Sequence, residues 1–272
     1  VVGSVAKTFL RKGYRVIGLH EGYTGLFNPS PRMVDIDYPM ADGIFNQGGS
    51  FLQMSRFKPK DSDFENNFNL KFFTDNNIKL LVTVGGDDTA STANRIAKFL
   101  EAKKYPIANI HVPKTIDNDL VLTDHTPGFG SAAKYVASTV REIVLDASVY
   151  QQRSVTIVEI MGRHAGWLTA ASRLARKYEG DNPCLIYLPE TPFSLEQFYN
   201  DLDAAFKKSP NLVACVSEGI ADEGGTFVCE YSDAAKLDSF GHKMLTGCGE
   251  VLESFVRDKF GVKVRSIELN VN

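Results

Sequence analysis

Apolar, β-branched runs alternate with helix-like segments along almost the whole of this 272-residue chain. The runs, which we interpret as strands, cover residues 14–20, 79–85, 109–115, 154–162, 184–190, 211–219 and 262–269. Between several of them, residues 89–104, 130–150, 166–178 and 194–208 have apolar side chains three and four positions apart, which is typical of amphipathic helices. Strands that are buried on both faces and separated by helices predict an α/β fold with mainly parallel sheets. In such a fold, ligands bind beyond the carboxyl ends of the strands.

The size and composition of the chain narrow its organisation and partners. The length suits two lobes, and we place their boundary in turn-rich sequence, giving residues 1–122 and 123–272. A formal net charge of −3 gives no reason to expect nucleic acid or a membrane surface as a partner. The four cysteines lack metal-site spacing, which favours a cytoplasmic protein over a secreted one. Because the chain begins and ends abruptly, we expect the first strand of one lobe and the C-terminal part of the other to be missing.

The run at residues 79–85 leads into the sequence GGDDT, residues 85–89. Small residues before a helix leave backbone N–H groups that can hold an anion. A carboxylate placed among phosphates is explained mainly by Mg²⁺, which prefers oxygen ligands. The alternative is that Asp88 or Thr89 only caps the helix that follows. The loop by itself does not decide between these interpretations.

The next strand leads into the sequence PKTIDND, residues 113–119. Asp117 and Asp119 are two positions apart, so an extended backbone would put both on one side. Together with Lys114 and Thr115, they match what phosphoryl transfer to a hydroxyl requires. That reaction needs one carboxylate as base, another for the metal, and donors for the phosphate. The alternative is an Asx-type turn, because Asp-Asn-Asp is favourable turn sequence.

Two later strand ends carry Gly162, Arg163 and His164 in one case and Glu218 in the other. Each of these residues also has an ordinary structural interpretation, as a helix-entry glycine, a cap or a surface side chain. Taken together, acidic strand ends, a Lys-Thr pair and several arginines indicate that phosphate, metal and a polar substrate converge. The sequence therefore favours phosphoryl transfer over simple sugar binding.

With GGDDT, PKTIDND and MGR in this order, the chain resembles the phosphofructokinase family. The resemblance covers essentially the whole chain and includes EGYTGL, TPGFGSAA and VSEG. It implies two Rossmann-like lobes with the active site between them, and phosphoryl transfer to the 1-hydroxyl of fructose 6-phosphate with Mg²⁺ as cofactor. It assigns residues 1–122 to the phosphoryl donor and Mg²⁺, and residues 123–272 to fructose 6-phosphate. It also implies a homo-oligomer, either a dimer or a tetramer.

The resemblance assigns roles to individual residues through these motifs. Asp117 resembles the base that takes the proton from the sugar hydroxyl, Thr115 resembles a residue that touches the transferred phosphoryl group, and Lys114 offers a cation to the donor. The other assignments, grouped by role, are Asp87 and Asp119 for the metal; Gly86, Asp88 and Arg56 for the donor; Met161, Gly162, Arg163 and Glu218, with Thr115, Asp117 and Asp119, for the sugar phosphate; and Arg153 and Arg265 for the 6-phosphate in a neighbouring subunit.

Asp88 and Lys114 bear on the identity of the phosphoryl donor. ATP-using members of the family typically have glycine in place of Asp88, and many have glycine in place of Lys114, whereas pyrophosphate-using members resemble this chain at both positions. Two like charges about 4 Å apart repel by roughly 1 kcal/mol in water and roughly 4 kcal/mol at an effective dielectric of 20. The resemblance therefore implies pyrophosphate as the donor, with Asp88 excluding ATP. An ATP-dependent phosphofructokinase and a non-catalytic sugar-phosphate-binding homologue stay open as alternatives.

Overall fold

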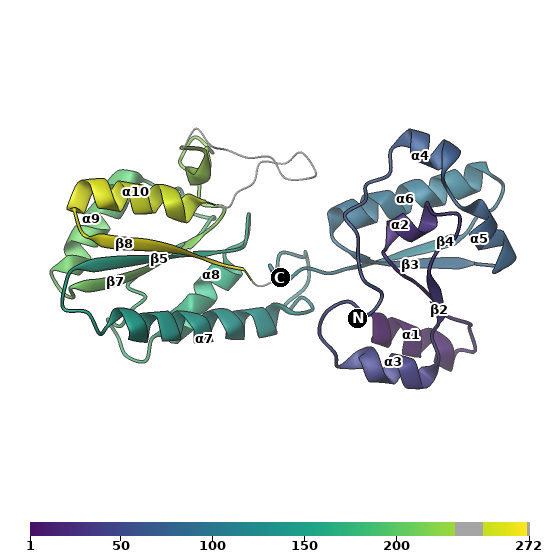
Figure 1. Cartoon of the computed structure of the whole chain (residues 1–272), viewed down its shortest axis with the longest axis horizontal. Helices are drawn as coiled ribbons and strands as arrows, with labels where there is room; N and C mark the ends of the chain where they lie inside the picture. The colour runs from purple at the N-terminus through teal and green to yellow at the C-terminus, as the bar shows by residue number, and fades with distance from the viewer. Residues whose placement is uncertain (232–246, 271–272) are drawn as a thin grey trace. The chain divides into compact units, whose positions relative to one another are not determined.

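The computed structural model describes residues 1–231 and 247–270 of the chain (Figure 1). It divides into two compact units, unit 1 from Val1 to Lys114 and unit 2 from Thr115 to Asn272. In these described ranges, no helix combines the length and the apolar character needed to cross a membrane. The sheets are mainly parallel, which confirms the predicted fold class.

Unit 2 is built on a four-stranded parallel sheet with the strand order β6-β7-β5-β8. The strands are β5 (Ser154–Ile160), β6 (Leu185–Tyr187), β7 (Asn211–Ser217) and β8 (Lys263–Leu269). The helices are α7 (Phe129–Ala147), α8 (Trp167–Ala171), α9 (Leu195–Phe206) and α10 (Cys248–Phe260), with short 3₁₀ helices η1 (Ser172–Ala175) and η2 (Val228–Tyr231). Helices α9 and α10 cover one face of the sheet, and α7 and α8 cover the other (Figure 1).

Strand β7 shows why this sheet needs helices on both faces, because all seven of its residues are buried. Leu212, Ala214 and Val216 pack in the cluster that contains α9 and α10. Val213 and Cys215 pack in the cluster that contains α7 and α8. Successive side chains of a strand point to opposite faces, so a continuous apolar run is buried only between two helical layers.

Unit 1 contains two small sheets: β1 (Ile17–Leu19) pairs antiparallel with β2 (Met33–Asp35), and β3 (Leu80–Gly85) pairs parallel with β4 (Ala108–Pro113). Its helices are α1 (Val2–Arg11), α2 (Tyr23–Leu26), α3 (Tyr38–Phe45), α4 (Asp61–Asn66), α5 (Leu70–Asp75) and α6 (Asp87–Ala102). Helix α6 packs along β3 and β4, as Figure 1 shows. The crossover from β3 through α6 to β4 is the βαβ arrangement that places two strand ends at one edge.

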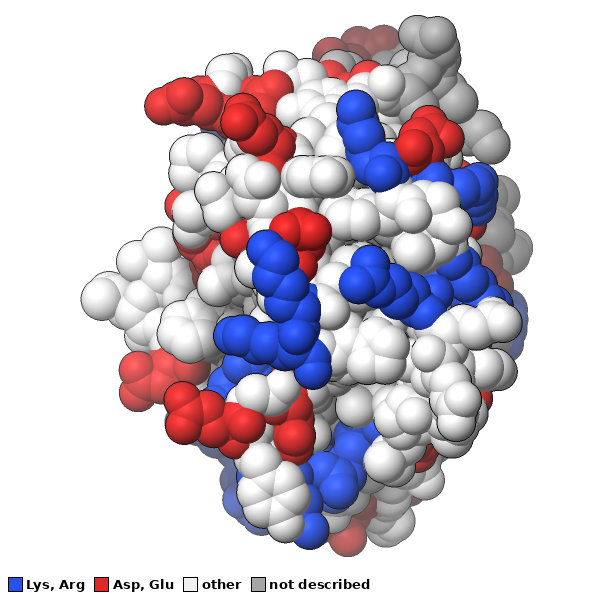
Figure 2. All heavy atoms as spheres, turned by 90° about the vertical axis from the view of Figure 1, so that its left-hand side faces the viewer, with Lys and Arg blue, Asp and Glu red and all other residues white. Residues whose placement is uncertain are grey.

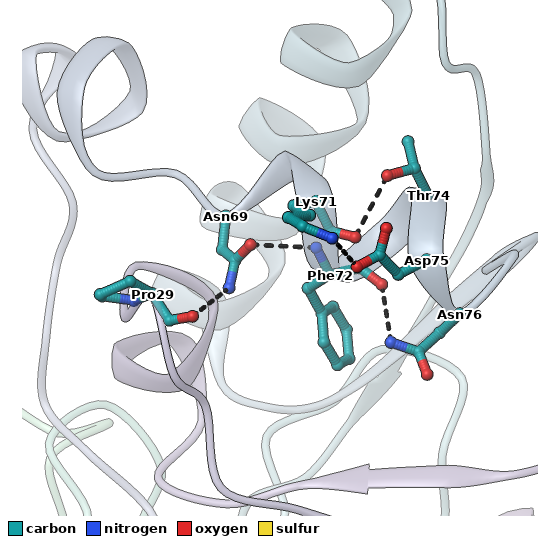
Figure 3. Close-up of polar contacts among 7 residues, drawn as sticks. All are labelled: Pro29, Asn69, Lys71, Phe72, Thr74, Asp75 and Asn76. Atoms are coloured by element: carbon teal, nitrogen blue, oxygen red, sulfur yellow. Dashed lines mark hydrogen bonds and ion pairs between the residues drawn. The ribbon is translucent and has the colours of Figure 1, made fainter.

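The larger core of unit 1 is rich in phenylalanine. Phe27 lies edge-on to Phe64 and Phe68, and Phe73 is completely buried. Helix α5 is tied into this core at its start, because Asn69 accepts a hydrogen bond from the Phe72 N–H over 3.0 Å. The amide of Asn69 also donates to the carbonyl oxygens of Asn28 and Pro29, as Figure 3 shows for Pro29. The same view shows the ion pair within α5 between Lys71 and Asp75.

The division between the units lies earlier than the boundary expected after residue 122, because residues 115–122 belong to unit 2. Ile116 packs against the α7 cluster of unit 2. The buried side chain of Asn118 accepts from the Thr126 N–H and donates to the Asp124 carbonyl oxygen. These contacts attach the segment to the sequence that follows it.

Candidate active site

The GGDDT loop of unit 1 lies at the carboxyl end of β3. Gly85 ends the strand, Gly86 is the N-cap residue of α6, and the helix begins at Asp87. A Cβ atom on Gly85 would overlap the side chain of Thr89, so this position requires glycine. The Lys114 N–H donates to the Gly85 carbonyl oxygen over 3.0 Å, which joins the start of the PKTIDND segment to the loop.

Asp88 does not serve as the N-cap of α6, because that position is taken by Gly86, which has no side chain. Its carboxylate instead accepts a hydrogen bond from the ammonium of Lys58 over 2.9 Å. Both side chains of this ion pair are 50% exposed, so the pair faces solvent at the start of the helix. The capping alternative for Asp88 is thus not what the structure has.

The other predicted residues of unit 1 can be placed only in part. Lys114 and Arg56 are exposed, and Arg56 lies two positions before Lys58 on the same segment. The side chain of Asp87 lies outside the described residues, so its assignment to the metal stays a prediction. Tyr23, from the EGYTGL motif, donates its hydroxyl to the Thr89 carbonyl oxygen over 2.6 Å. Burial raises the pKa of Tyr23 to about 12, so its hydroxyl stays protonated as a donor at neutral pH.

The part of the PKTIDND segment that belongs to unit 2, residues 115–119, forms a compact turn. The Asp117 N–H donates to the Thr115 hydroxyl over 3.0 Å. Asn118 has a left-handed backbone with φ of 61°, and its amide makes the two bonds to Thr126 and Asp124 described above. The turn chemistry offered as an alternative is therefore present, with Thr115 and Asn118 supplying side chains for it. Asp117 is half-buried and Asp119 is exposed.

The carboxyl ends of β5 and β7 form the second part of the unit 2 site. Glu218 accepts a hydrogen bond from the Gly162 N–H over 3.1 Å, and the Ser217 hydroxyl donates to the Gly162 carbonyl oxygen over 2.6 Å. Gly162 has φ of 132°, which favours glycine. A Cβ atom on Gly219 would overlap the backbone carbonyl of Arg163. The MGR segment and Glu218 are thus held against each other by backbone contacts.

Electrostatic interactions connect these two parts of unit 2. Burial raises the pKa of Glu218, and the hydrogen bond from Gly162 opposes that shift. The negative charge of Asp117 raises the same pKa further, and the positive charge of Arg163 lowers it. Asp117, Arg163 and Glu218, which lie far apart in sequence, are therefore close enough for their charges to interact.

The metal prediction rests on carboxylates that the structure describes only in part. Of the side chains it describes, no three His, Cys, Asp or Glu residues gather in a way that could hold a metal ion. Mg²⁺ is usually held by one or two carboxylates together with waters and substrate phosphates, so a site with few protein ligands fits it. The exposed carboxylate of Asp119 is of the right chemical type.

Arg153 and Arg265 are not brought together within one chain. Arg265 donates to the Asp146 carboxylate on α7 over 2.7 Å, on the α7 face of the sheet. Arg153 lies over the Phe206 ring of α9, on the other face, at 5.2 Å from the ring centroid. It also precedes β5, whereas Gly162 follows that strand, and seven strand residues span roughly 23 Å.

Figure 2 shows the end of unit 2 at which the parallel strands begin, with lysine and arginine side chains spread among acidic ones. Two basic residues close to strand starts have partners: Lys207, which follows α9, pairs with Asp203, and Lys263, the first residue of β8, lies over the Tyr150 ring. The predicted sugar-phosphate residues lie at the opposite, carboxyl end of the strands, where ligands of parallel sheets bind. Basic charge at the strand starts is therefore separate from that site.

Sequence reasoning missed several residues that shape these sites. Ser217 and Gly219 flank Glu218 in the VSEG motif, and Asn118 lies between the two predicted carboxylates. Their positions inside quoted motifs could have singled them out. Lys58 is different, because no motif marks it and only the folded chain brings it to Asp88.

Comparison with known proteins places the chain in a family. The phosphofructokinase family model matches residues 1–268. A pyrophosphate–fructose 6-phosphate 1-phosphotransferase of Halomonas elongata is 39% identical over 196 residues, covering 71% of this chain and 46% of that protein. A sulfofructose kinase of Alkalicoccus urumqiensis is 35% identical over 204 residues, covering 75% of this chain and 51% of that protein.

The fold agrees with these relatives. The crystal structure of a pyrophosphate-dependent phosphofructokinase from Marinobacter aquaeolei matches with a TM-score of 0.74 at 29% identity, covering 98% of this chain and 64% of that one. The chain spans about half the length of the first curated relatives it matches. The family match extends over nearly the whole chain and includes all strands of both units except the last residue of β8. The chain therefore belongs to the phosphofructokinase family.

Proposed function

We propose that the protein transfers a phosphoryl group from inorganic pyrophosphate to the 1-hydroxyl of fructose 6-phosphate. The observation that carries this proposal is the Asp88 carboxylate, which is exposed in the first turn of α6. ATP-using members of the family typically have glycine in place of Asp88. The name of the Halomonas elongata relative, pyrophosphate–fructose 6-phosphate 1-phosphotransferase, supports the same donor and acceptor.

In the proposed mechanism, Asp117 accepts the proton of the 1-hydroxyl as that oxygen attacks one phosphorus atom of pyrophosphate, and the bond from this phosphorus to the bridging oxygen breaks to release inorganic phosphate. A correctly placed carboxylate base of this kind contributes about 10²–10⁴ in rate. Thr115 and Lys114 bind the transferred group, the hydroxyl by hydrogen bonding and the ammonium by charge. Mg²⁺, held by Asp87 and Asp119 when bound, would neutralise charge on the donor phosphates.

The acceptor binds through residues of unit 2. The sugar phosphate contacts four residues, Met161, Gly162, Arg163 and Glu218. Glu218 has a charge of each sign near it, because Asp117 raises its pKa and Arg163 lowers it. Arg153 and Arg265 lie on opposite faces of their own sheet, so we assign them to the 6-phosphate of a neighbouring subunit in a homo-oligomer. The spacing of the cysteines, which has no metal-site pattern, favours a cytoplasmic setting.

The test measures product formation by the full-length protein with fructose 6-phosphate and, in turn, pyrophosphate and ATP. We expect fructose 1,6-bisphosphate with pyrophosphate and a much lower catalytic efficiency with ATP. A third arm replaces the acceptor by 6-sulfofructose, because one relative carries the name sulfofructose kinase. Higher efficiency with ATP, or with the sulfonated sugar, would overturn the proposed donor or acceptor respectively.

A further inference from the structure

We propose that Lys58 is a donor-specificity residue that acts through Asp88. In this proposal, the Lys58 ammonium positions the Asp88 carboxylate at the start of α6, and the phosphoryl donor meets this ion pair instead of a lone carboxylate. The inference rests on the proposed function, because it concerns how the same donor site tells pyrophosphate from ATP.

The geometry of the pair leaves both groups able to face a ligand. Lys58 Nζ lies 2.9 Å from Asp88 Oδ1, and each side chain is half exposed. An ammonium group has three N–H donors, so one bond to Asp88 leaves two that can bind a phosphate oxygen. Pyrophosphate is small and highly charged. A cation held beside a carboxylate should therefore bind the terminal oxygens of pyrophosphate better than it binds those of the bulkier ATP.

The residues on both sides of Lys58 pack against the rest of unit 1, so the position of Lys58 beside Asp88 is fixed by more than their surface ion pair. The ring of Phe57 packs edge-on to Phe27, with 5.4 Å between their centroids. The buried Pro59 accepts a hydrogen bond at its carbonyl from the Arg95 guanidinium over 2.6 Å. Arg95 belongs to α6, the helix that carries Asp88. The segment that holds Lys58 is therefore fastened to the same helix as its partner.

The pair also changes the charge that a donor meets. The pair itself carries no net charge, whereas Lys58→Met would leave −1 at this position and Asp88→Gly would leave +1. A bare −1 repels both donors, so loss of Lys58 should weaken both. A bare +1 attracts phosphates, so part of any ATP use gained by Asp88→Gly should come from the released lysine. Specificity would then come from a positioned repulsive group and its counter-charge together.

A double-mutant cycle in the full-length protein tests this inference. The wild type, Lys58→Met, Asp88→Gly and the double variant are compared by the calorimetric affinity for Mg-pyrophosphate and for Mg-ATP, and by catalytic efficiency with each. We expect Lys58→Met to weaken pyrophosphate binding about fivefold, the upper end for an exposed ion pair. The ATP gain of Asp88→Gly should be at least about threefold smaller when Lys58 is absent, a coupling expected of residues in contact.

The controls separate a role in specificity from a purely structural one. Lys58→Arg keeps the charge and should keep the donor ratio near the wild-type value. Lys71→Met removes a similar ion pair from α5 (Figure 3) and should leave both affinities unchanged. Thermal unfolding midpoints of the Lys58 variants should match the wild type, since exposed pairs add little stability.

The outcomes distinguish this inference from the proposed function. Additive effects of Lys58→Met and Asp88→Gly on both affinities, to within about 1.5-fold, would overturn the inference even if the enzyme turns over pyrophosphate. Lys58-dependent pyrophosphate binding without turnover would support the inference and overturn the proposed reaction. A wild type that binds no pyrophosphate would overturn both.

Discussion

The donor side in unit 1 and the sugar side in unit 2 are constructed differently. At the donor side, Asp88 and Lys58 meet across a half-exposed ion pair, and Gly86 has open space where a side chain would be. At the sugar side, the Gly162 N–H donates a hydrogen bond to the Glu218 carboxylate. Gly162 and Gly219 both lie so close to other backbone atoms that there is no room for a Cβ atom on either.

This difference indicates where each kind of change can be tolerated. Exposed charges can be exchanged at small cost in stability, so the donor side can change its ligand without disturbing the core. Backbone packing cannot be altered without moving neighbouring atoms, so changes at the sugar side should affect folding as well as binding.

Asp117→Ser should have the largest effect on catalysis, with turnover reduced by about 10²–10⁴ because the proposed base is removed. The Michaelis constant for fructose 6-phosphate should change much less. Steady-state kinetics of the full-length variant with pyrophosphate checks this. Near-normal turnover would show that the sugar side contributes binding alone and would remove the assigned role of Asp117.

Gly219→Ala should destabilise unit 2 by about 3 kcal/mol or more, since its Cβ atom would overlap the carbonyl of Arg163. Gly130→Ala is the matched control within α7, where a Cβ atom meets nothing within 4 Å. That control should be neutral or gain up to about 1 kcal/mol from helix propensity. Chemical unfolding curves measure both, and equal stabilities for the two variants would contradict the rigid construction of the sugar side.

Asp88→Gly should shift the ratio of catalytic efficiencies toward ATP by about tenfold or more, which corresponds to at least about 1.4 kcal/mol. The shift follows from removing a negative charge and a side chain from the donor side. Its unfolding midpoint should stay near that of the wild type, in contrast to Gly219→Ala. A donor ratio that changes by less than about twofold would mean that Asp88 does not select the donor.

Among the changes in stability, that of Glu218→Gln should be the smallest, and it should appear only in the pH dependence. Because the folded-state pKa of Glu218 is raised, its contribution to stability is present below the unfolded-state value of about 4.3 and is lost as pH rises through the folded-state value. Glutamine keeps an acceptor for the Gly162 N–H but does not titrate. The wild type should therefore lose stability relative to the variant as pH rises through this window, and parallel pH profiles of the unfolding midpoint would contradict the raised pKa.

The long apolar runs made the central elements predictable. Strands β5, β7 and β8 were expected within two residues of their observed ends. Strands β5 and β7 are almost completely buried, so their apolar runs are nearly continuous, whereas β8 is only partly buried. The three-residue strand β2 was missed, since Met33–Asp35 is too short for any periodicity. Residues 166–178 were expected as one helix, yet α8 ends at Ala171 and continues as a 3₁₀ turn.

The candidate site was predictable only where local sequence determines the chemistry. Arg163 and Glu218 follow β5 and β7, which are neighbours in the sheet of unit 2, and Asp117 follows β4 along the chain. Reasoning from strand ends therefore singled out all three residues. Lys58 was not foreseen because its role depends on a contact between residues thirty positions apart in sequence. The sequence also could not show that Arg153 and Arg265 lie on different faces of the sheet, because this depends on the register of β8 against β5.

The division between Lys114 and Thr115 cuts through the PKTIDND motif. A trans peptide bond keeps the Cα atoms of these two residues about 3.8 Å apart, whatever the rest of either unit does. For protein engineering, this peptide bond is a suitable point at which to join segments of two related proteins. A unit 1 taken from a relative and joined at this bond would place its own lysine directly before the recipient's threonine. Such a chimera needs no added linker, because one peptide bond makes the connection.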